Sequence, residues 1–103
     1  MATGTLGQAA LAAATNTTVY TVPSATTATI IISAVNKGSS VAAVRLAVSA
    51  ADTPTDAEYL EYNTPMEVGG VLERTGIVVS SDKKVVAYST TAGVTINVYG
   101  YEA

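Results

Sequence analysis

Apolar and polar residues alternate along most of the chain beyond residue 17, with the two-residue period that is typical of β-strands. The clearest runs cover residues 28–36, 41–49 and 94–101. Because every second side chain of a strand lies on the same face of its sheet, one set in each run should point into a core. The predicted core consists of Ile30, Ile32, Leu46, Val48, Val79, Val94, Ile96 and Val98.

Shorter runs with the same period predict further strands at residues 17–22, 57–62, 71–80 and 84–90. Proline cannot donate to a strand ladder, so Pro23 should end the first of these strands. We expect Gly38 to take a positive φ in a turn, Asn63-Thr64-Pro65 to bend the chain, and Thr75-Gly76 to form a bulge. Seven or eight short strands at this spacing predict an all-β fold, an antiparallel β-sandwich of the jelly-roll or immunoglobulin-like kind.

The N-terminal stretch breaks this pattern. Residues 6–14 are rich in alanine, which favours helix, but so short a segment is marginal unless it packs against something. We therefore predict that residues 1–17 are a loosely ordered segment or a docking arm, and that residues 18–103 form the β-sandwich domain. No basic residue precedes the apolar part of the N-terminus, as a signal peptide would require. No apolar run approaches the roughly 18 residues that span a bilayer.

The composition removes most side chains that carry chemistry. His, Cys, Trp and Phe are absent, whereas the chain has 16 Thr, 18 Ala and 14 Val. Imidazole is the usual proton shuttle near neutral pH, and thiolates and imidazoles are the best nucleophiles and transition-metal ligands. The sequence therefore predicts a protein that is not an enzyme and that holds no cofactor or metal.

Charged residues make up only 13% of the chain, against about 25% in an average soluble domain. The net charge is −3 and the five basic residues are scattered, so no footprint for nucleic acid is present. Thr, Ser and Ala cover the surface instead, and such small side chains lose little rotamer entropy when a partner covers them. This surface favours assembly with other proteins, with a Thr-rich β-surface that binds nothing as the alternative.

Four carboxylates gather between residues 52 and 61, namely Asp52, Asp56, Glu58 and Glu61. Carboxylates and loop carbonyls are the ligands that Ca²⁺ prefers, but the spacing matches no EF-hand and lacks its central glycine. We therefore interpret this segment as a solvated acidic loop, with a Ca²⁺ site as the alternative. A glycosidase pair is a weaker reading, because the chain has no Trp to stack against a sugar.

Tyrosines are the best candidates for an interface. Tyr99 and Tyr101 fall on the outward register of the last predicted strand, and Tyr59 faces away from Leu60. Exposed tyrosines supply a large, rigid contact area with a polar tip, and they are enriched at interfaces. The alternative is that they pack under loops or form cross-strand pairs. For Arg74, a structural salt bridge is the expected role.

Four segments of the chain resemble a known group of proteins: Tyr20-Thr21-Val22-Pro23, Glu58-Tyr59-Leu60-Glu61-Tyr62, Leu72-Glu73-Arg74-Thr75-Gly76 and Val98-Tyr99-Gly100-Tyr101-Glu102. In this order they are similar to small virion proteins of tailed phages, especially phages of marine bacteria and cyanobacteria. The resemblance covers about residues 18–102. It implies a β-sandwich that decorates a virion, and it carries over no catalytic residue.

The predicted function is that of a virion structural protein, most specifically a capsid decoration protein on the outer surface of the phage head. Its expected partner is the major capsid protein or another virion protein, together with further copies of itself; nucleic acid and membrane are not expected partners. The alternative is a tail, neck or fibre component that binds host-surface glycan. A long, aromatic-lined loop face would favour that alternative, and Tyr62 is the only aromatic residue near a predicted loop.

Overall fold

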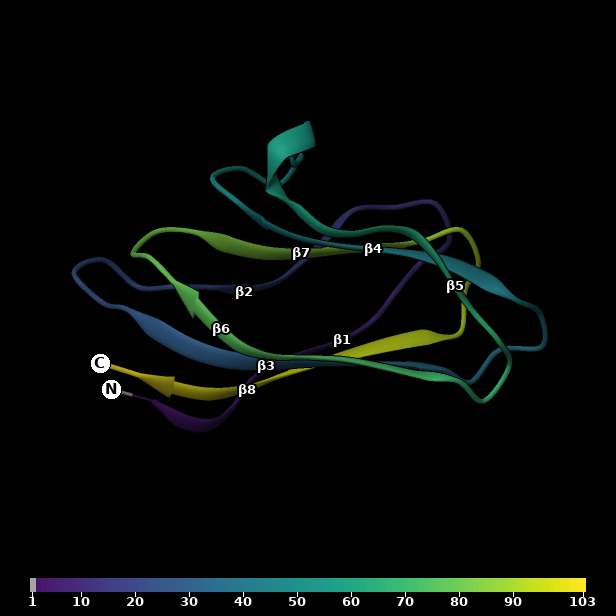
Figure 1. Cartoon of the computed structure of the whole chain (residues 1–103), viewed down its shortest axis with the longest axis horizontal. Coiled ribbons are helices and arrows are strands. Elements are labelled where there is room, and N and C mark those ends of the chain that lie inside the picture. Colours follow the sequence, from purple (N-terminus) through teal and green to yellow (C-terminus); the bar gives the residue numbers. More distant parts are fainter. Residues whose placement is uncertain (1) are drawn as a thin grey trace.

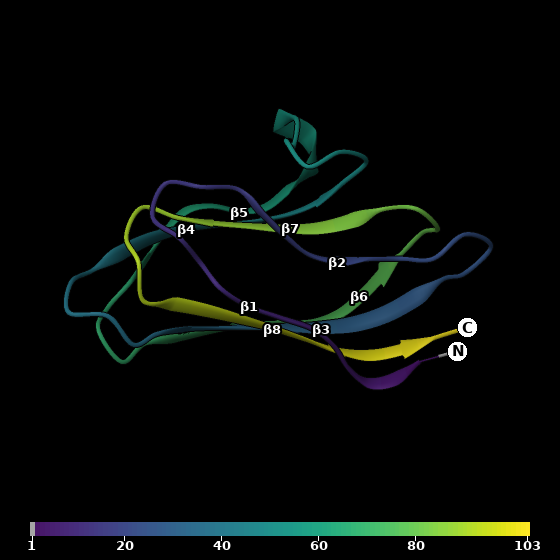
Figure 2. The ribbon, with the colours of Figure 1, turned by 180° about the vertical axis from the view of Figure 1, so that it is seen from behind.

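The computed structural model describes residues 2–103 as two four-stranded antiparallel sheets that pack face to face (Figures 1 and 2). In chain order the strands are β1 (Thr3–Ala10), β2 (Thr17–Thr21), β3 (Ala28–Asn36), β4 (Ala42–Ser49), β5 (Tyr59–Met66), β6 (Val71–Val79), β7 (Lys84–Ser89) and β8 (Val94–Glu102). A short 3-10 helix, η1 (Asp56–Glu58), precedes β5. The predicted antiparallel sandwich is confirmed. In the described part of the chain, no helix has the length and apolar character needed to cross a membrane.

The order of the strands decides between the two predicted kinds of sandwich. Sheet A has the order β1-β8-β3-β6, and sheet B has the order β2-β7-β4-β5. The first strand pairs with the eighth, the second with the seventh, the third with the sixth and the fourth with the fifth. This nested pairing is that of an eight-stranded jelly roll. An immunoglobulin-like sandwich instead pairs its first strand with its second.

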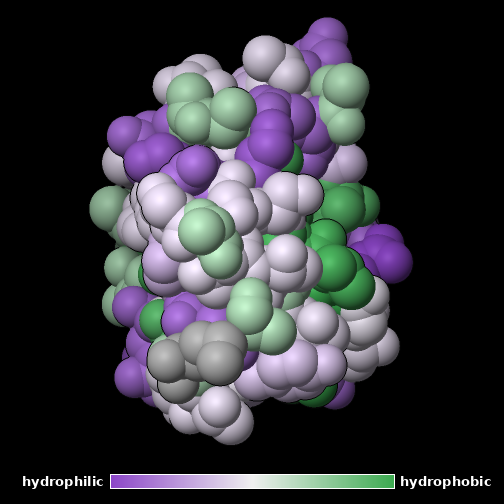
Figure 3. All heavy atoms as spheres, turned by 90° about the vertical axis from the view of Figure 1, so that its left-hand side faces the viewer, coloured by the Kyte–Doolittle hydropathy of each residue, from purple (hydrophilic) through white to green (hydrophobic). Residues whose placement is uncertain are grey.

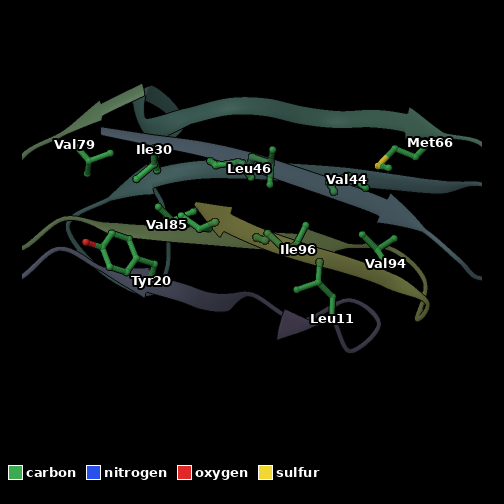
Figure 4. Close-up of a cluster of buried hydrophobic side chains, with 14 of the residues drawn as sticks. Leu11, Tyr20, Ile30, Val44, Leu46, Met66, Val79, Val85, Val94 and Ile96 are labelled. Carbon is green, nitrogen blue, oxygen red and sulfur yellow. The ribbon is translucent and has the colours of Figure 1, made fainter. Parts of the chain in front are cut away.

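The core lies between the two sheets and is filled by the inward residues of both (Figure 4). All of the predicted core residues except Val48 are buried. Val48, one residue before the end of β4, is only half-buried, although it packs against the core. The same cluster also contains Leu11, Tyr20, Val22, Ala28, Ala34, Ala42, Val44, Met66, Val85 and Ala87.

Residues 3–10 form strand β1 of sheet A, so the prediction of a loosely ordered segment or docking arm was wrong for this stretch. Strand β1 pairs with β8 from Thr3 opposite Tyr101 to Ala10 opposite Thr95. A free edge of β8 offers hydrogen-bond partners, and this ladder outweighs the weak helical preference of the alanines. Leu6 also packs against the core. Met1, the first residue of the predicted arm, lies outside the described residues.

The far end of β8 ties the N-terminus to the opposite sheet. The Glu102 carboxylate accepts hydrogen bonds from the Ala2 amide at 3.1 Å and from the Tyr20 hydroxyl at 2.5 Å. Burial of the phenol, together with the Glu102 contact, raises the pKa of Tyr20. The bond with Tyr20, followed by the bond with Ala2, lowers the pKa of Glu102. These contacts link β1, β2 and β8 across the two sheets.

Three local predictions have different outcomes. The bulge at Thr75-Gly76 is confirmed, since Gly76 has a φ of 67° and the β3–β6 register shifts between Ile30 and Ile32. The bend at residues 63–65 was wrong, because these residues lie within β5. Gly38 does not take a positive φ; it lies so close to the turn before β8 that a β-carbon on it would be 3.0 Å from the Ala92 carbonyl oxygen.

Each of the four strands at the sheet edges is interrupted. The register shifts in β1, β2, β5 and β6, in every case within the ladder that joins the edge strand to its neighbour. Bulges twist an edge and hinder the addition of a further strand from another chain. The edges are therefore poor sites for assembly, and the two outer faces of the sandwich are the surfaces to consider.

Candidate functional site

The outer face of sheet A presents Tyr99 and Tyr101. Tyr101 lies opposite Thr3 on one neighbouring strand and Thr29 on the other, and Tyr99 lies opposite Thr5 and Ile31. The two tyrosines are 38% and 51% exposed. Their predicted outward orientation is confirmed, and each ring stands among small or β-branched side chains.

Among the outward strand residues of sheet A, Glu73 is the only charged one. The remaining positions of this face are occupied by Thr3, Thr5, Gln8, Ala10, Thr29, Ile31, Ser33, Val35, Val71, Val78, Thr95, Asn97, Tyr99 and Tyr101. A hydrogen bond of 2.7 Å from the Gln8 amide to Asn97 Oδ1 joins two of them across the strands. Val78 is 68% exposed at the edge of the face. Figure 3, a view of the end that carries the termini, shows pale, weakly polar residues there among more hydrophilic and more hydrophobic ones.

The loop at residues 50–58 partly covers the outer face of sheet B. Hydrogen bonds to the Glu58 carboxylate hold this loop in place. The Glu58 carboxylate accepts hydrogen bonds from the amides of Thr55 and Ala50, at 2.8 and 3.1 Å, and from the Ser49 hydroxyl at 3.0 Å. The bonds with Thr55 and Ala50 lower the pKa of Glu58 from 4.5 to about 2. On this side of the sheet Ala47, Ser49 and Val86 are buried.

The other carboxylates of the predicted acidic loop have separate partners. Asp52 accepts a hydrogen bond from Thr18 at 2.5 Å and lies 3.4 Å from the Lys84 ammonium. These two contacts, that with Thr18 first, lower the pKa of Asp52. Glu61 pairs with Arg74 and accepts a hydrogen bond from Thr64 at 2.6 Å. The salt bridge predicted for Arg74 is confirmed, and residues 2–103 contain no group of three or more acidic side chains placed to hold a metal ion.

An aromatic cluster stands beside this loop on the outer face of sheet B. The Arg45 guanidinium lies between the rings of Tyr62 and Tyr88, 4.4 Å from each ring centroid, and its Nε donates to Asn63 Oδ1 at 2.7 Å. Tyr59 meets Tyr62 edge to face, with ring centroids 4.9 Å apart and an interplanar angle of 79°. Cation–π contacts on both sides favour this arrangement of the guanidinium and the rings of Tyr62 and Tyr88.

Two irregularities in β5 create the cluster. In a regular strand Tyr59 and Tyr62, three residues apart, would face opposite sides. Here Ala47 lies opposite Tyr59 but Leu46 lies opposite Glu61, so the extra residue Leu60 restores both tyrosines to the outer face. A second shift leaves Tyr62 and Asn63 together opposite Arg45, with Asn63 at a φ of 53°. Both residues contact that arginine.

The loop and the cluster enclose an open pocket of about 340 Å³ lined by Asp56, Tyr59 and Tyr62. Tyr59, one of the three predicted interface residues, therefore lies on the opposite sheet from Tyr99 and Tyr101. The three residues do not form a single surface. Sequence reasoning missed Arg45, Tyr88 and the pocket. The bulges that align these residues cannot be recognised from the alternation of apolar and polar residues along the chain.

Comparisons with family models, with curated proteins and with solved structures found no match to this chain. The two outer faces are thus the basis for assigning a function. One has Glu73 as its only charged strand residue, and the other holds an aromatic pocket.

Proposed function

We propose that this protein is a non-enzymatic structural protein that docks through the outer face of sheet A onto a larger protein surface. The observation that carries the proposal is that this four-stranded face has Glu73 as its only charged strand residue and exposes Tyr99 and Tyr101. Covering such a face removes few charges from water and freezes few flexible side chains. The two tyrosines on β8 supply the rigid contact area on which binding energy concentrates.

The more specific proposal is a capsid decoration protein on the head of a tailed phage, with the major capsid protein as its partner. Two features support it. Four segments resemble small virion proteins of tailed phages, and the jelly-roll fold is used by viral capsid proteins, an argument from analogy alone. The neutral face suits a partner surface that is itself poor in charge.

Docking through the face is favoured over strand addition at an edge, because all four edge strands are interrupted by bulges. A specific contact should bury at least about 1,000 Å² in total over both partners. Each copy would be held by its own contact with the partner surface, so neighbouring copies would not need to touch one another. Additional self-association is compatible with this arrangement.

The docking face is tested by binding of purified protein to virions of the phage that encodes it. Tyr99→Ser and Tyr101→Ser should each weaken binding about tenfold or more, because each removes a central aromatic anchor. Tyr62→Ser, on the opposite sheet, is the matched control and should bind like the wild type. Circular dichroism verifies that all three variants are folded. Undiminished binding of both sheet A variants would exclude this face.

The placement on the head is tested separately by quantitative mass spectrometry of the same virions. A decoration protein should be present at a copy number comparable with that of the major capsid protein. A handful of copies per particle would instead assign the protein to the neck, tail or fibres. Complete absence from the virion would overturn the virion proposal while leaving open the docking face itself.

A further inference from the structure

The pocket lined by Asp56, Tyr59 and Tyr62 faces away from sheet A, so a protein docked through sheet A would present it to the solvent. We propose that this pocket binds a neutral saccharide, with a sugar ring packed against Tyr59 and Tyr62 and with sugar hydroxyls donating hydrogen bonds to Asp56. This inference does not depend on the proposed docking function, because it uses a different face of the molecule.

The two rings are held in place before any ligand arrives. Arg45 packs 4.4 Å from the centroid of Tyr62, and Tyr59 meets Tyr62 at 79°. The hydrogen bond from Arg45 to Asn63 fixes the guanidinium in turn. A site whose side chains are already ordered loses little entropy on binding, and weak ligands benefit most from such order.

The Asp56 carboxylate is available to a ligand. Asp52, Glu58 and Glu61 each have hydrogen-bond or ion-pair partners, whereas Asp56 has neither with any of residues 2–103. An ionised carboxylate only accepts hydrogen bonds, and it can accept two at once. Adjacent hydroxyls of a sugar ring are donors with that spacing, and bonds to a charged acceptor are the stronger kind.

The charges around the pocket select a neutral ligand. A cation would be attracted by Asp56 but repelled by the like charge of the Arg45 guanidinium, which lies 4.4 Å from the centroid of the Tyr62 ring. An anion would be repelled by Asp56. A saccharide avoids both conflicts, because its slightly positive C–H groups suit the negative face of an aromatic ring and its hydroxyls suit the carboxylate.

The size of the pocket agrees with this ligand class. Its volume of about 340 Å³ lies near the lower end for small-molecule sites, and the pocket is broadly open to solvent. One or two sugar rings fit a pocket of this kind, with the rest of a longer chain extending into water. With so few contacts, a dissociation constant of about 1 mM is expected for a single sugar unit.

The experiment is a titration of the full chain with methyl β-glucoside, methyl β-galactoside and N-acetylglucosamine, followed by NMR of the tyrosine ring signals. At least one sugar should shift the signals of Tyr59 and Tyr62 in a saturable way and leave those of Tyr99 and Tyr101 unchanged. No saturable shift at Tyr59 and Tyr62 with any of the three, up to about 50 mM, would overturn the proposal, since this is far above the expected dissociation constant. Tighter binding of tetramethylammonium to the same rings would overturn it too.

Variants separate this site from the docking face. Asp56→Ala should weaken sugar binding about tenfold or more, and Tyr59→Ala about threefold to tenfold. Tyr59→Leu keeps a large apolar side chain, so it can test the loss of the aromatic ring if the alanine variant misfolds. Tyr101→Ala is the control, which should bind sugar normally and bind virions poorly, whereas Asp56→Ala should do the reverse. Normal sugar binding by folded Asp56→Ala and Tyr59→Ala would place the ligand elsewhere.

Discussion

The two outer faces of this sandwich are built from similar strands and differ in almost every surface property. On sheet A, β3 and β8 pair without interruption from Ala28 to Asn36, and the side chains above them are neutral. On sheet B, β5 carries two register shifts, and the loop at residues 50–58 covers part of the sheet. Sheet A also has one register shift in each of its edge ladders, so the pocket results from the two shifts within β5 together with the adjacent loop, and not from irregular pairing as such.

The difference also separates two uses of tyrosine. Tyr99 and Tyr101 stand on the outer face of sheet A without an aromatic neighbour among their cross-strand partners. Tyr59 and Tyr62 contact each other, and Tyr62 shares the Arg45 guanidinium with Tyr88. The first pair is free to contact a partner, while the second pair shapes a cavity.

Removing the core that both faces share should have the largest effect. Ile32→Ala in sheet A and Leu46→Ala in sheet B should each lower the free energy of unfolding by about 2–5 kcal/mol, because each leaves a cavity at a fully buried position. Chemical denaturation measures the loss. A loss below about 1 kcal/mol for either variant, the size of a surface effect, would show that its sheet does not pack tightly against the core.

Arg45 should matter less for stability, and only for sheet B. Arg45→Ala removes two cation–π contacts and a hydrogen bond, and it should lower the free energy of unfolding by about 1–2 kcal/mol. The same variant should free the ring of Tyr62, which is visible as altered ring signals in NMR. Virion binding through sheet A should be unchanged. A simultaneous loss of virion binding would show that the two faces are coupled.

The strand pattern predicted much of sheet A and little of the pocket. Both bounds of β3 and the exposure of Tyr99 and Tyr101 follow from alternation, which is a local property. The pairing of β1 with β8 was missed because it joins opposite ends of the chain, and nothing in residues 3–10 marks their partner. The pocket was missed because one extra residue, Leu60, reverses which residues of β5 face outward.

Acidification should release the loop at residues 50–58 from sheet B before it affects the strand pairing of sheet A. The folded pKa of Glu58 is about 2, below its ordinary value of 4.5. Its stabilising contribution is therefore complete above about pH 4.5 and is lost as the pH falls toward 2. The protection of the Ala50 and Thr55 amides against hydrogen exchange, relative to the intrinsic exchange rate at each pH, should fall over this range, while amides in the β3–β8 ladder stay protected. Glu58→Ala removes both acceptor oxygens and should leave these two amides with low protection at every pH, and undiminished protection in that variant would show that Glu58 does not hold the loop.

The smallest effect is expected from the one charge on the outer face of sheet A. Glu73→Gln should leave the free energy of unfolding within about 0.5 kcal/mol of the wild type, because Glu73 is exposed. Since docking would otherwise take this charge out of water, virion binding should become slightly stronger. Isothermal titration or co-sedimentation measures the change. Clearly weaker binding would indicate that Glu73 pairs with a cation of the partner, and the face would then not be recognised through its neutrality.

The central claim is that sheet A, and not sheet B, is the docking face, and tyrosine footprinting on virion-bound protein tests it most directly. Tyr101 and Tyr62 are 51% and 57% exposed in the free protein, so they should react at similar rates before binding and serve as internal references for each other. Docking through sheet A predicts that binding protects Tyr99 and Tyr101 and leaves Tyr62 reactive. Protection of Tyr62, with Tyr99 and Tyr101 reacting as in the free protein, would contradict it.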